Sequence, residues 1–160
     1  MSRLDDFEQR IHRVIPLTHA MGTRLYHYDG RQLVVTAPLE PNRNHQGTGF
    51  GGSVYSVAVL AAWGLLELAV DDAGIAGTVV IQSGAMDYGQ PVDGNFFATC
   101  QLPEAEEWER FLTMLRRRGR GRLSLKSALF TGAPVLAPGQ PAAAFFEGRF
   151  VVVRQDATGA

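Results

Sequence analysis

The feature that most constrains the fold is an apolar run from Val54 to Val70, in which Glu67 is the only charged residue. A helix that is apolar on nearly every face belongs inside a protein. The length of the run approaches that of a membrane span, but Ser, Tyr and Gly residues interrupt it and Asp71-Asp72 ends it. We therefore expect a long buried helix over about residues 51-70 and no membrane partner.

The start of this helix predicts a site for an anion or an oxyanion. The first backbone N–H groups of a helix have no partner within the helix and lie at the positive end of its dipole. Gly51 and Gly52 carry no side chains that would keep a ligand's carbonyl away from these amides. Ser53 suits the N-cap or the first turn.

The polar loop before the helix holds the candidates for chemistry. The carboxamide of Asn44 is able to donate a hydrogen bond to the same oxygen that the Gly51 or Gly52 amide would bind. The alternative is an asparagine that only forms loop hydrogen bonds. His45 is either a base or a bystander in a solvated loop. Asn42 has a weaker claim, since it could serve only to shape the loop.

Several motifs resemble a known family. Residues 42–53, Asn-x-Asn-x-x-x-Thr-x-Phe-Gly-Gly-Ser, resemble hotdog-fold thioesterases. They are more closely similar to the putative thioesterase family that also occurs as the C-terminal half of a two-domain acetyltransferase protein. Met86-Asp-Tyr88-Gly-Gln-Pro91, Cys100-Gln-Leu-Pro103 and Phe146-Glu-Gly148-Arg-Phe agree with it, so the resemblance covers almost the whole chain.

The resemblance implies which residues form the site. It places the family's catalytic asparagine at Asn44, the second Asn of the Asn-x-Asn motif, beside the amides of Gly51 and Gly52. We expect substrate contacts around it from Asn42, Thr48, Phe50, Ser53, Tyr55, Ser56 and Asp87.

Periodicity and turn signals place the remaining elements. We expect an amphipathic helix over 3–20, a hairpin of strands 23–28 and 32–37 around Asp29-Gly30, and a second helix over 104–117. Further strands are expected at 77–88, 95–102, 123–131 and 142–153. With the resemblance, this predicts an α+β hotdog fold, in which a curled antiparallel sheet of about six strands wraps around the buried helix. Residues 1-154 form the single domain, and 155-160 a frayed tail.

The choice of reaction depends on a position two turns into the helix. Hotdog hydrolases with the Gly-Gly helix start usually carry Asp or Glu there, whereas this chain has Val59. Ser56 without a paired base is a poor nucleophile, Glu67 lies two further turns away, and Asp87 either substitutes or points to solvent.

Two reactions and one binding role follow. Hydrolysis normally needs a base to activate water, whereas decarboxylation of a malonyl thioester needs only a stabilised enolate oxygen. Because the family includes malonyl-acyl carrier protein decarboxylases, we favour decarboxylation to acetyl-acyl carrier protein in fatty acid synthesis. Hydrolysis of acyl-CoA or acyl carrier protein thioesters is the alternative, and a non-catalytic acyl-binding dimer is the third possibility.

An arginine run and a free sheet edge predict partners. Five of the residues from Arg116 to Arg122 are arginines, on a chain of formal net charge -1. Arg118, Arg120 and Arg122 suit the phosphates of coenzyme A or an acidic acyl carrier protein, although a favourable helix end and a general preference for Arg explain them equally. Nucleic acid is the weakest choice. A six-stranded hotdog sheet exposes an edge, so we expect a homodimer or higher homo-oligomer.

Composition bounds the remaining classes. With 160 residues, 46% of them hydrophobic, the chain fits one domain with an ample core. Cys100 is the only cysteine, which excludes an internal disulfide and a cysteine-based metal cluster, and we expect neither a metal nor a cofactor. Met1 to Gln9 is acidic rather than basic and apolar, so we expect no signal peptide and a cytoplasmic protein.

Overall fold

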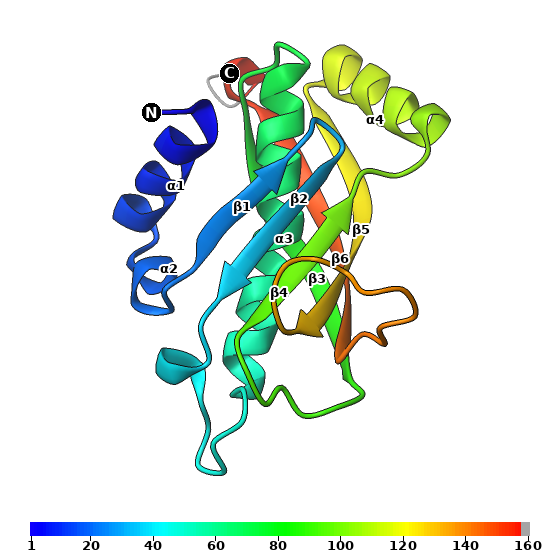
Figure 1. Ribbon diagram of the computed structural model, residues 1–160. Coiled ribbons are helices and arrows are strands. Elements are labelled where there is room, and N and C mark those ends of the chain that lie inside the picture. The colour runs from blue at the N-terminus through cyan, green and yellow to red at the C-terminus, as the bar shows by residue number, and fades with distance from the viewer. Residues whose placement is uncertain (158–160) are drawn as a thin grey trace.

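The computed structural model describes residues 1–157. Its sheet has six strands in the order β1-β2-β4-β5-β6-β3, every neighbouring pair is antiparallel, and the sheet curls around α3 (Figure 1). The predicted hotdog architecture is therefore confirmed. The strands are β1 (Arg24–Tyr28), β2 (Gln32–Ala37), β3 (Gly77–Tyr88), β4 (Phe96–Gln101), β5 (Arg120–Thr131) and β6 (Ala144–Arg154).

The long helix α3 (Gly51–Asp72) is the core of the protein. Its side chains at Val57, Leu65 and Leu66 are completely buried against the concave face of the sheet. Each such burial stabilises the fold by about 1.5–3 kcal/mol. By length and composition α3 is also able to cross a membrane, but 67% of its most apolar window is buried within the protein.

The N-terminal segment forms two helices rather than the single helix expected over residues 3–20. They are α1 (Arg3–Val14) and α2 (Pro16–Ala20). The break lies at Ile15, whose φ of -126° and ψ of 79° are not helical. A proline disfavours helical geometry in the residue before it, so Pro16 explains the break.

The second expected helix is α4 (Ala105–Arg118), which ends at Gly119 with a φ of 71°. Strand β5 then begins at Arg120, three residues earlier than the sequence indicated. Along this start, arginine side chains alternate outward with buried Gly121 and Leu123. A Cβ at residue 121 would lie 2.8 Å from the Phe111 ring, so α4 packs closely on this glycine.

Strand β3 forms one edge of the sheet, since it pairs only with β6. Most of its residues are exposed, including the apolar side chains of Val80, Ile81 and Tyr88. At Val79, the backbone carbonyl accepts from Trp63 Nε1 at 3.0 Å and the N–H donates to Glu67 Oε1 at 3.3 Å. Side chains of α3 thus bind the backbone at the start of this edge.

The end of the described chain is ordered further than expected. Residues Gln155–Ala157 form a 3-10 turn, η2, and the Gln155 N–H donates to the Ala76 carbonyl at 3.0 Å. The predicted tail thus includes a hydrogen-bonded turn at 155–157. The rest of that predicted tail, 158–160, lies outside the described residues.

Candidate active site

The start of α3 presents backbone donors without acceptors. Phe50 is the N-cap, with φ -62° and ψ 131°, and its side chain makes no capping bond. The first amide that bonds within the helix is that of Val54, which donates to the Phe50 carbonyl at 3.0 Å. Among residues 1–157, nothing accepts from the amides of Gly51, Gly52 or Ser53. Ser53 is thus a first-turn residue, and the expected donor cluster is present.

Aromatic rings pack closely against both glycines. A Cβ on Gly52 would lie 2.5 Å from the Phe50 ring, and a Cβ on Gly51 would lie 3.6 Å from the Tyr88 ring. Tyr88 Oη donates to the Gly51 carbonyl at 2.8 Å. Desolvation, and to a smaller extent the neighbouring Tyr55, raise the pKa of Tyr88. Sequence reasoning did not assign Tyr88 to the site, although it lies in the motif Met86-Asp-Tyr88.

Asn42 anchors the loop to the body of the protein. Its buried Nδ2 donates to the carbonyls of Met21 and Pro38, both at 2.8 Å. Its backbone carbonyl accepts from the Phe50 N–H at 2.7 Å, directly before α3. These bonds support a loop-shaping role for Asn42.

Asn44 makes its hydrogen bonds within the loop. Its Oδ1 accepts from the N–H groups of Gln46 at 2.8 Å and Thr48 at 3.1 Å. Its Nδ2 donates to Thr48 Oγ1 at 2.9 Å and makes a long contact of 3.4 Å with the Gly49 carbonyl. One amide hydrogen is therefore well held and the other weakly held. The loop bonds that the sequence left as an alternative are present, and the catalytic role of Asn44 stays a prediction.

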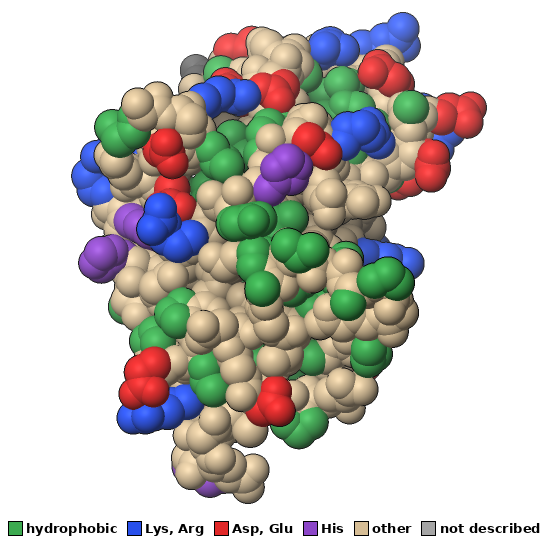
Figure 2. All heavy atoms as spheres, viewed as in Figure 1, with side chains coloured by type: hydrophobic (Ala, Val, Ile, Leu, Met, Phe, Trp, Pro, Cys, Tyr) green, Lys and Arg blue, Asp and Glu red, His purple; other side chains and the backbone are tan. Residues whose placement is uncertain are grey.

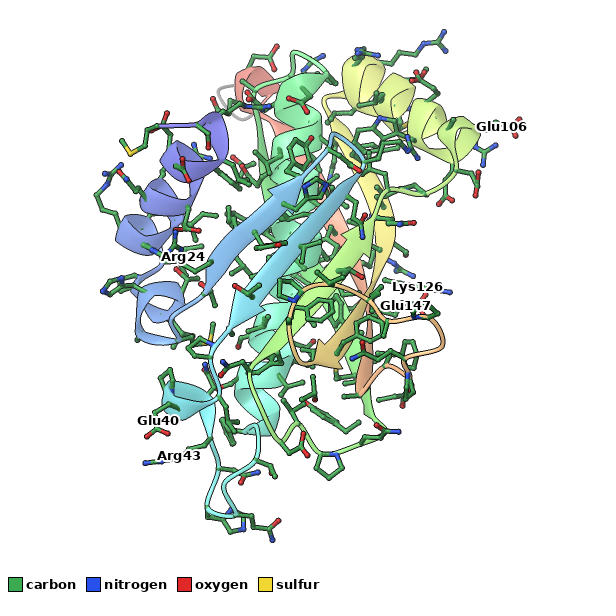
Figure 3. The ribbon with its side chains drawn as sticks, viewed as in Figure 1. Arg24, Glu40, Arg43, Glu106, Lys126 and Glu147 are labelled. Carbon is green, nitrogen blue, oxygen red and sulfur yellow. The ribbon has the colours of Figure 1, made fainter. Side chains whose placement is uncertain are left out.

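The loop itself projects from the body beyond the start of α3 (Figure 1). A bridge between Arg43 and Gly49 closes its neck, and Arg43 also pairs with Glu40 at 2.8 Å, both lying at its base (Figure 3). His45 is exposed on this loop. It is therefore accessible to a ligand or partner.

Two polar candidates do not face the donor cluster. Ser56 Oγ donates to the Gly52 carbonyl at 2.8 Å, which commits its hydroxyl to the helix. Asp87 precedes Tyr88 on β3, and since Tyr88 turns toward α3, strand alternation sends Asp87 to the opposite face. Within one protomer Asp87 therefore faces away from the donor cluster, and its role as a base or in substrate binding stays a prediction.

The arginine run lies at the other end of α3. Arg116 Nη2 donates to the carbonyl of Ala73, which caps the end of the helix, at 3.3 Å. A helix of 22 residues is about 33 Å long. Within one protomer Arg118, Arg120 and Arg122 thus lie far from the donor cluster, and their expected contact with coenzyme A phosphates or an acidic carrier stays a prediction. With Arg110 they line a hollow of about 790 Å³ between α4 and β5.

On the face shown in Figure 2, most charged side chains lie at the end of the molecule that holds α1 and α4. The middle of this face is more apolar. No ion pair joins Arg110, Arg118, Arg120 or Arg122 to an acid among the described residues. These side chains are therefore free to bind an anionic surface.

Comparison with known proteins agrees with the fold. A protein of unknown function from Chlorobaculum tepidum is 35% identical, with a TM-score of 0.88 over 94% of each chain. A structure described as a putative thioesterase, from Shewanella oneidensis, is 27% identical, with a TM-score of 0.81 over 94% of this chain and 96% of that one. The PaaI protein of E. coli, from its phenylacetic acid degradation operon, shares the fold at 17% identity and a TM-score of 0.63, over 96% of each chain.

The family model described as "Putative thioesterase (yiiD_Cterm)" matches residues 4–154. This range includes the loop, the donor cluster at the start of α3 and all six strands. The chain belongs to this hotdog-fold thioesterase family.

Proposed function

We propose that the protein acts on acyl thioesters at the start of α3, and that its favoured reaction is decarboxylation of a malonyl thioester to an acetyl thioester. The observation that carries this proposal is the set of unbound amides at Gly51, Gly52 and Ser53, with no carboxylate on the first four turns of α3. Donors fixed in this way stabilise an oxyanion, and these turns of α3 lack a carboxylate base that would activate water.

Decarboxylation needs only donors that stabilise the thioester oxygen. The thioester oxygen accepts hydrogen bonds from the α3 amides and from the weakly held hydrogen of Asn44 Nδ2. The bond between C2 and the carboxylate breaks, carbon dioxide leaves, and the electron pair forms the enolate whose oxygen the donors stabilise. A proton from solvent then converts C2 to the methyl group of the acetyl thioester.

Hydrolysis is the second candidate. It is favoured by the match to the thioesterase family and by the solved relative from Shewanella oneidensis that is described as a thioesterase. In this reaction His45 is the residue within the loop able to serve as base.

We also propose a homodimer that joins two copies of β3. The exposed edge with its apolar side chains suits pairing with a second copy. Antiparallel two-fold pairing would set the two α3 helices in opposite directions, because β3 and α3 are fixed to each other in each protomer. The arginine run of one protomer would then lie at the same end as the donor cluster of the other, where it would hold an acyl carrier protein or coenzyme A.

A substrate panel tests the reaction. Acetyl, malonyl and longer acyl thioesters are presented on both coenzyme A and acyl carrier protein, while carbon dioxide and free thiol are measured separately. Decarboxylation predicts carbon dioxide and an equal amount of acetyl thioester. Free thiol without carbon dioxide would support hydrolysis, and neither product from any substrate would support a binding protein.

A further inference from the structure

Tyr55 lies one helical turn after Gly51, and its ring is held rigidly. It makes an edge contact with the ring of Phe146, with 5.5 Å between centroids, and Phe146 is buried in the core. A core ring of this kind fixes the position of the aromatic side chain that packs on it. This contact restricts the Tyr55 ring, and with it the position of the hydroxyl.

Gly84 of strand β3 has no side chain, and this makes space for the Tyr55 hydroxyl. A Cβ on Gly84 would lie 2.3 Å from Tyr55 Oη, which is far closer than non-bonded atoms approach. The φ of Gly84 is not in the left-handed region, so the backbone does not itself require glycine there. What requires glycine is the position of the Tyr55 hydroxyl under the strand.

The Tyr55 hydroxyl makes no hydrogen bond to the described part of the protein. Within residues 1–157, Tyr55 Oη has no hydrogen-bond partner. The neighbouring hydroxyls differ, because Tyr88 donates to the Gly51 carbonyl and Ser56 to the Gly52 carbonyl. Tyr55 is half-buried rather than enclosed, so its free donor is accessible to a ligand. A tyrosine hydroxyl held this firmly is suited to recognise an acceptor.

The place of this donor relative to a bound thioester follows from helix geometry. Four residues along a helix correspond to a rise of about 6 Å. With the thioester oxygen on the amides of Gly51 to Ser53, and with the acyl group extended along α3, the residue one turn further along the helix lies beside the acyl group rather than beside the sulfur. In that arrangement an oxygen on C3 is the first hydrogen-bond acceptor of the acyl group beyond the thioester itself.

We propose that the Tyr55 hydroxyl donates a hydrogen bond to an oxygen on C3 of the acyl group, and so selects malonyl and other 3-oxygenated thioesters over unsubstituted ones. The proposal rests on the proposed function, since it takes the α3 amides as the site of the thioester oxygen. For a malonyl group, the bond also orients the carboxylate. Decarboxylation requires the breaking C2–C3 bond to stand perpendicular to the plane of the thioester, so that its electrons enter the carbonyl system.

Tyr55→Phe is the direct test, because it removes the hydroxyl and keeps the ring on Phe146. Loss of a hydrogen bond to a charged acceptor predicts a fall in kcat/KM for a malonyl thioester of about 10- to 100-fold. The affinity for an acetyl thioester, which has no oxygen on C3, is expected to stay unchanged. Tyr26→Phe, on an exposed tyrosine of β1, is the matched control and should change neither value.

Gly84→Ala supplies a second, independent perturbation. The added methyl group pushes the hydroxyl away, so it should reproduce the selective loss of malonyl turnover. In the Tyr55→Phe background the same methyl group should cost little further activity, since the hydroxyl that it displaces is already gone.

Two results would overturn the proposal. One is an unchanged kcat/KM for the malonyl thioester in Tyr55→Phe, and the other is an equal loss for malonyl and acetyl thioesters, which would indicate a structural role only. A wild-type protein that turns over no malonyl thioester would instead contradict the proposed reaction. In that event the ratio of malonyl to acetyl thioester affinities, measured by calorimetry on wild type and Tyr55→Phe, still tests the hydroxyl.

Discussion

Tyr88 Oη donates to the carbonyl of Gly51 at 2.8 Å, and this bond ties the last residue of the edge strand β3 to the first residue of α3. The donor cluster is therefore positioned from two sides. The loop holds it through the Asn42 carbonyl and the Phe50 N–H, and the sheet holds it through Tyr88. We therefore expect a change at the end of β3 to reach the amides that we propose to bind the substrate oxygen.

Removing this bond should loosen the start of α3. We expect Tyr88→Phe to lower the free energy of unfolding by about 0.5–1.5 kcal/mol, the usual net value of one hydrogen bond, and toward the lower end because Tyr88 is exposed. Urea denaturation measures it, with Tyr26→Phe as the control. A variant as stable as wild type, with unchanged kcat, would show that the bond does not position the helix.

The sequence predicted the parts of the fold that depend on local chemistry. The helix from Gly51 was readable because glycines precede an apolar run, and the hairpin at Asp29-Gly30 because its turn residues are specific. The break at Ile15 was missed although Pro16 signals it, and the early start of β5 was hidden because arginines occupy its outward positions.

The site was less predictable because it depends on distances across the fold. Asn44 and the glycines are close in sequence, so the sequence suggested that they act together, which stays a prediction. The separation of the arginine run from them depends on α4 packing near the far end of α3, which no local pattern specifies. The side of the sheet that Asp87 faces required knowing that Tyr88 bonds to Gly51.

Glu67 makes stability depend on pH. Desolvation, opposed by the Val79 N–H and by Arg10, raises the pKa of this carboxyl in the folded protein. The folded state therefore binds the proton more tightly than the unfolded chain, so this contribution is present below the ordinary carboxyl pKa and is lost as pH rises through the folded pKa. We expect Glu67→Gln to stabilise the protein more at neutral pH than at pH 4. Denaturation across this range measures it, and a pH-independent difference would contradict the account.

The arginine run should act in binding rather than in chemistry. Replacing Arg118, Arg120 and Arg122 by Ala is expected to raise KM for a carrier-bound substrate and to weaken its dependence on salt, with kcat nearly unchanged. Steady-state kinetics at two ionic strengths measure this. Replacement of Arg13 and Arg31 by Ala, which removes two exposed charges elsewhere on the protein, is the control. An unaltered KM would leave the run without a role in substrate binding.

We expect the free edge of β3 to form the dimer interface. Charged side chains on an edge strand oppose pairing with another strand, so Val80→Lys with Ile81→Lys is expected to yield a monomer. Sedimentation at micromolar concentration measures the mass, and circular dichroism checks that the fold is kept. If the site also uses the second copy, activity should fall with the mass. A wild-type protein that is already a monomer would refute the shared site.

The most direct test of the oxyanion site is the turnover of Asn44→Ala beside Thr48→Val. Thr48→Val removes the acceptor of the strong loop bond and leaves the Asn44 carboxamide in place, so it separates the effect of the carboxamide from the effects of the loop bond and of any contact between Thr48 and substrate. The account predicts that Asn44→Ala lowers kcat for a malonyl thioester by on the order of 10² to 10³, the usual loss of one oxyanion donor, with KM little altered. Thr48→Val should retain most activity, and His45→Ala should continue to release carbon dioxide. A folded Asn44→Ala protein with full activity, or an equal loss in Thr48→Val, would contradict the role of Asn44 at the start of α3.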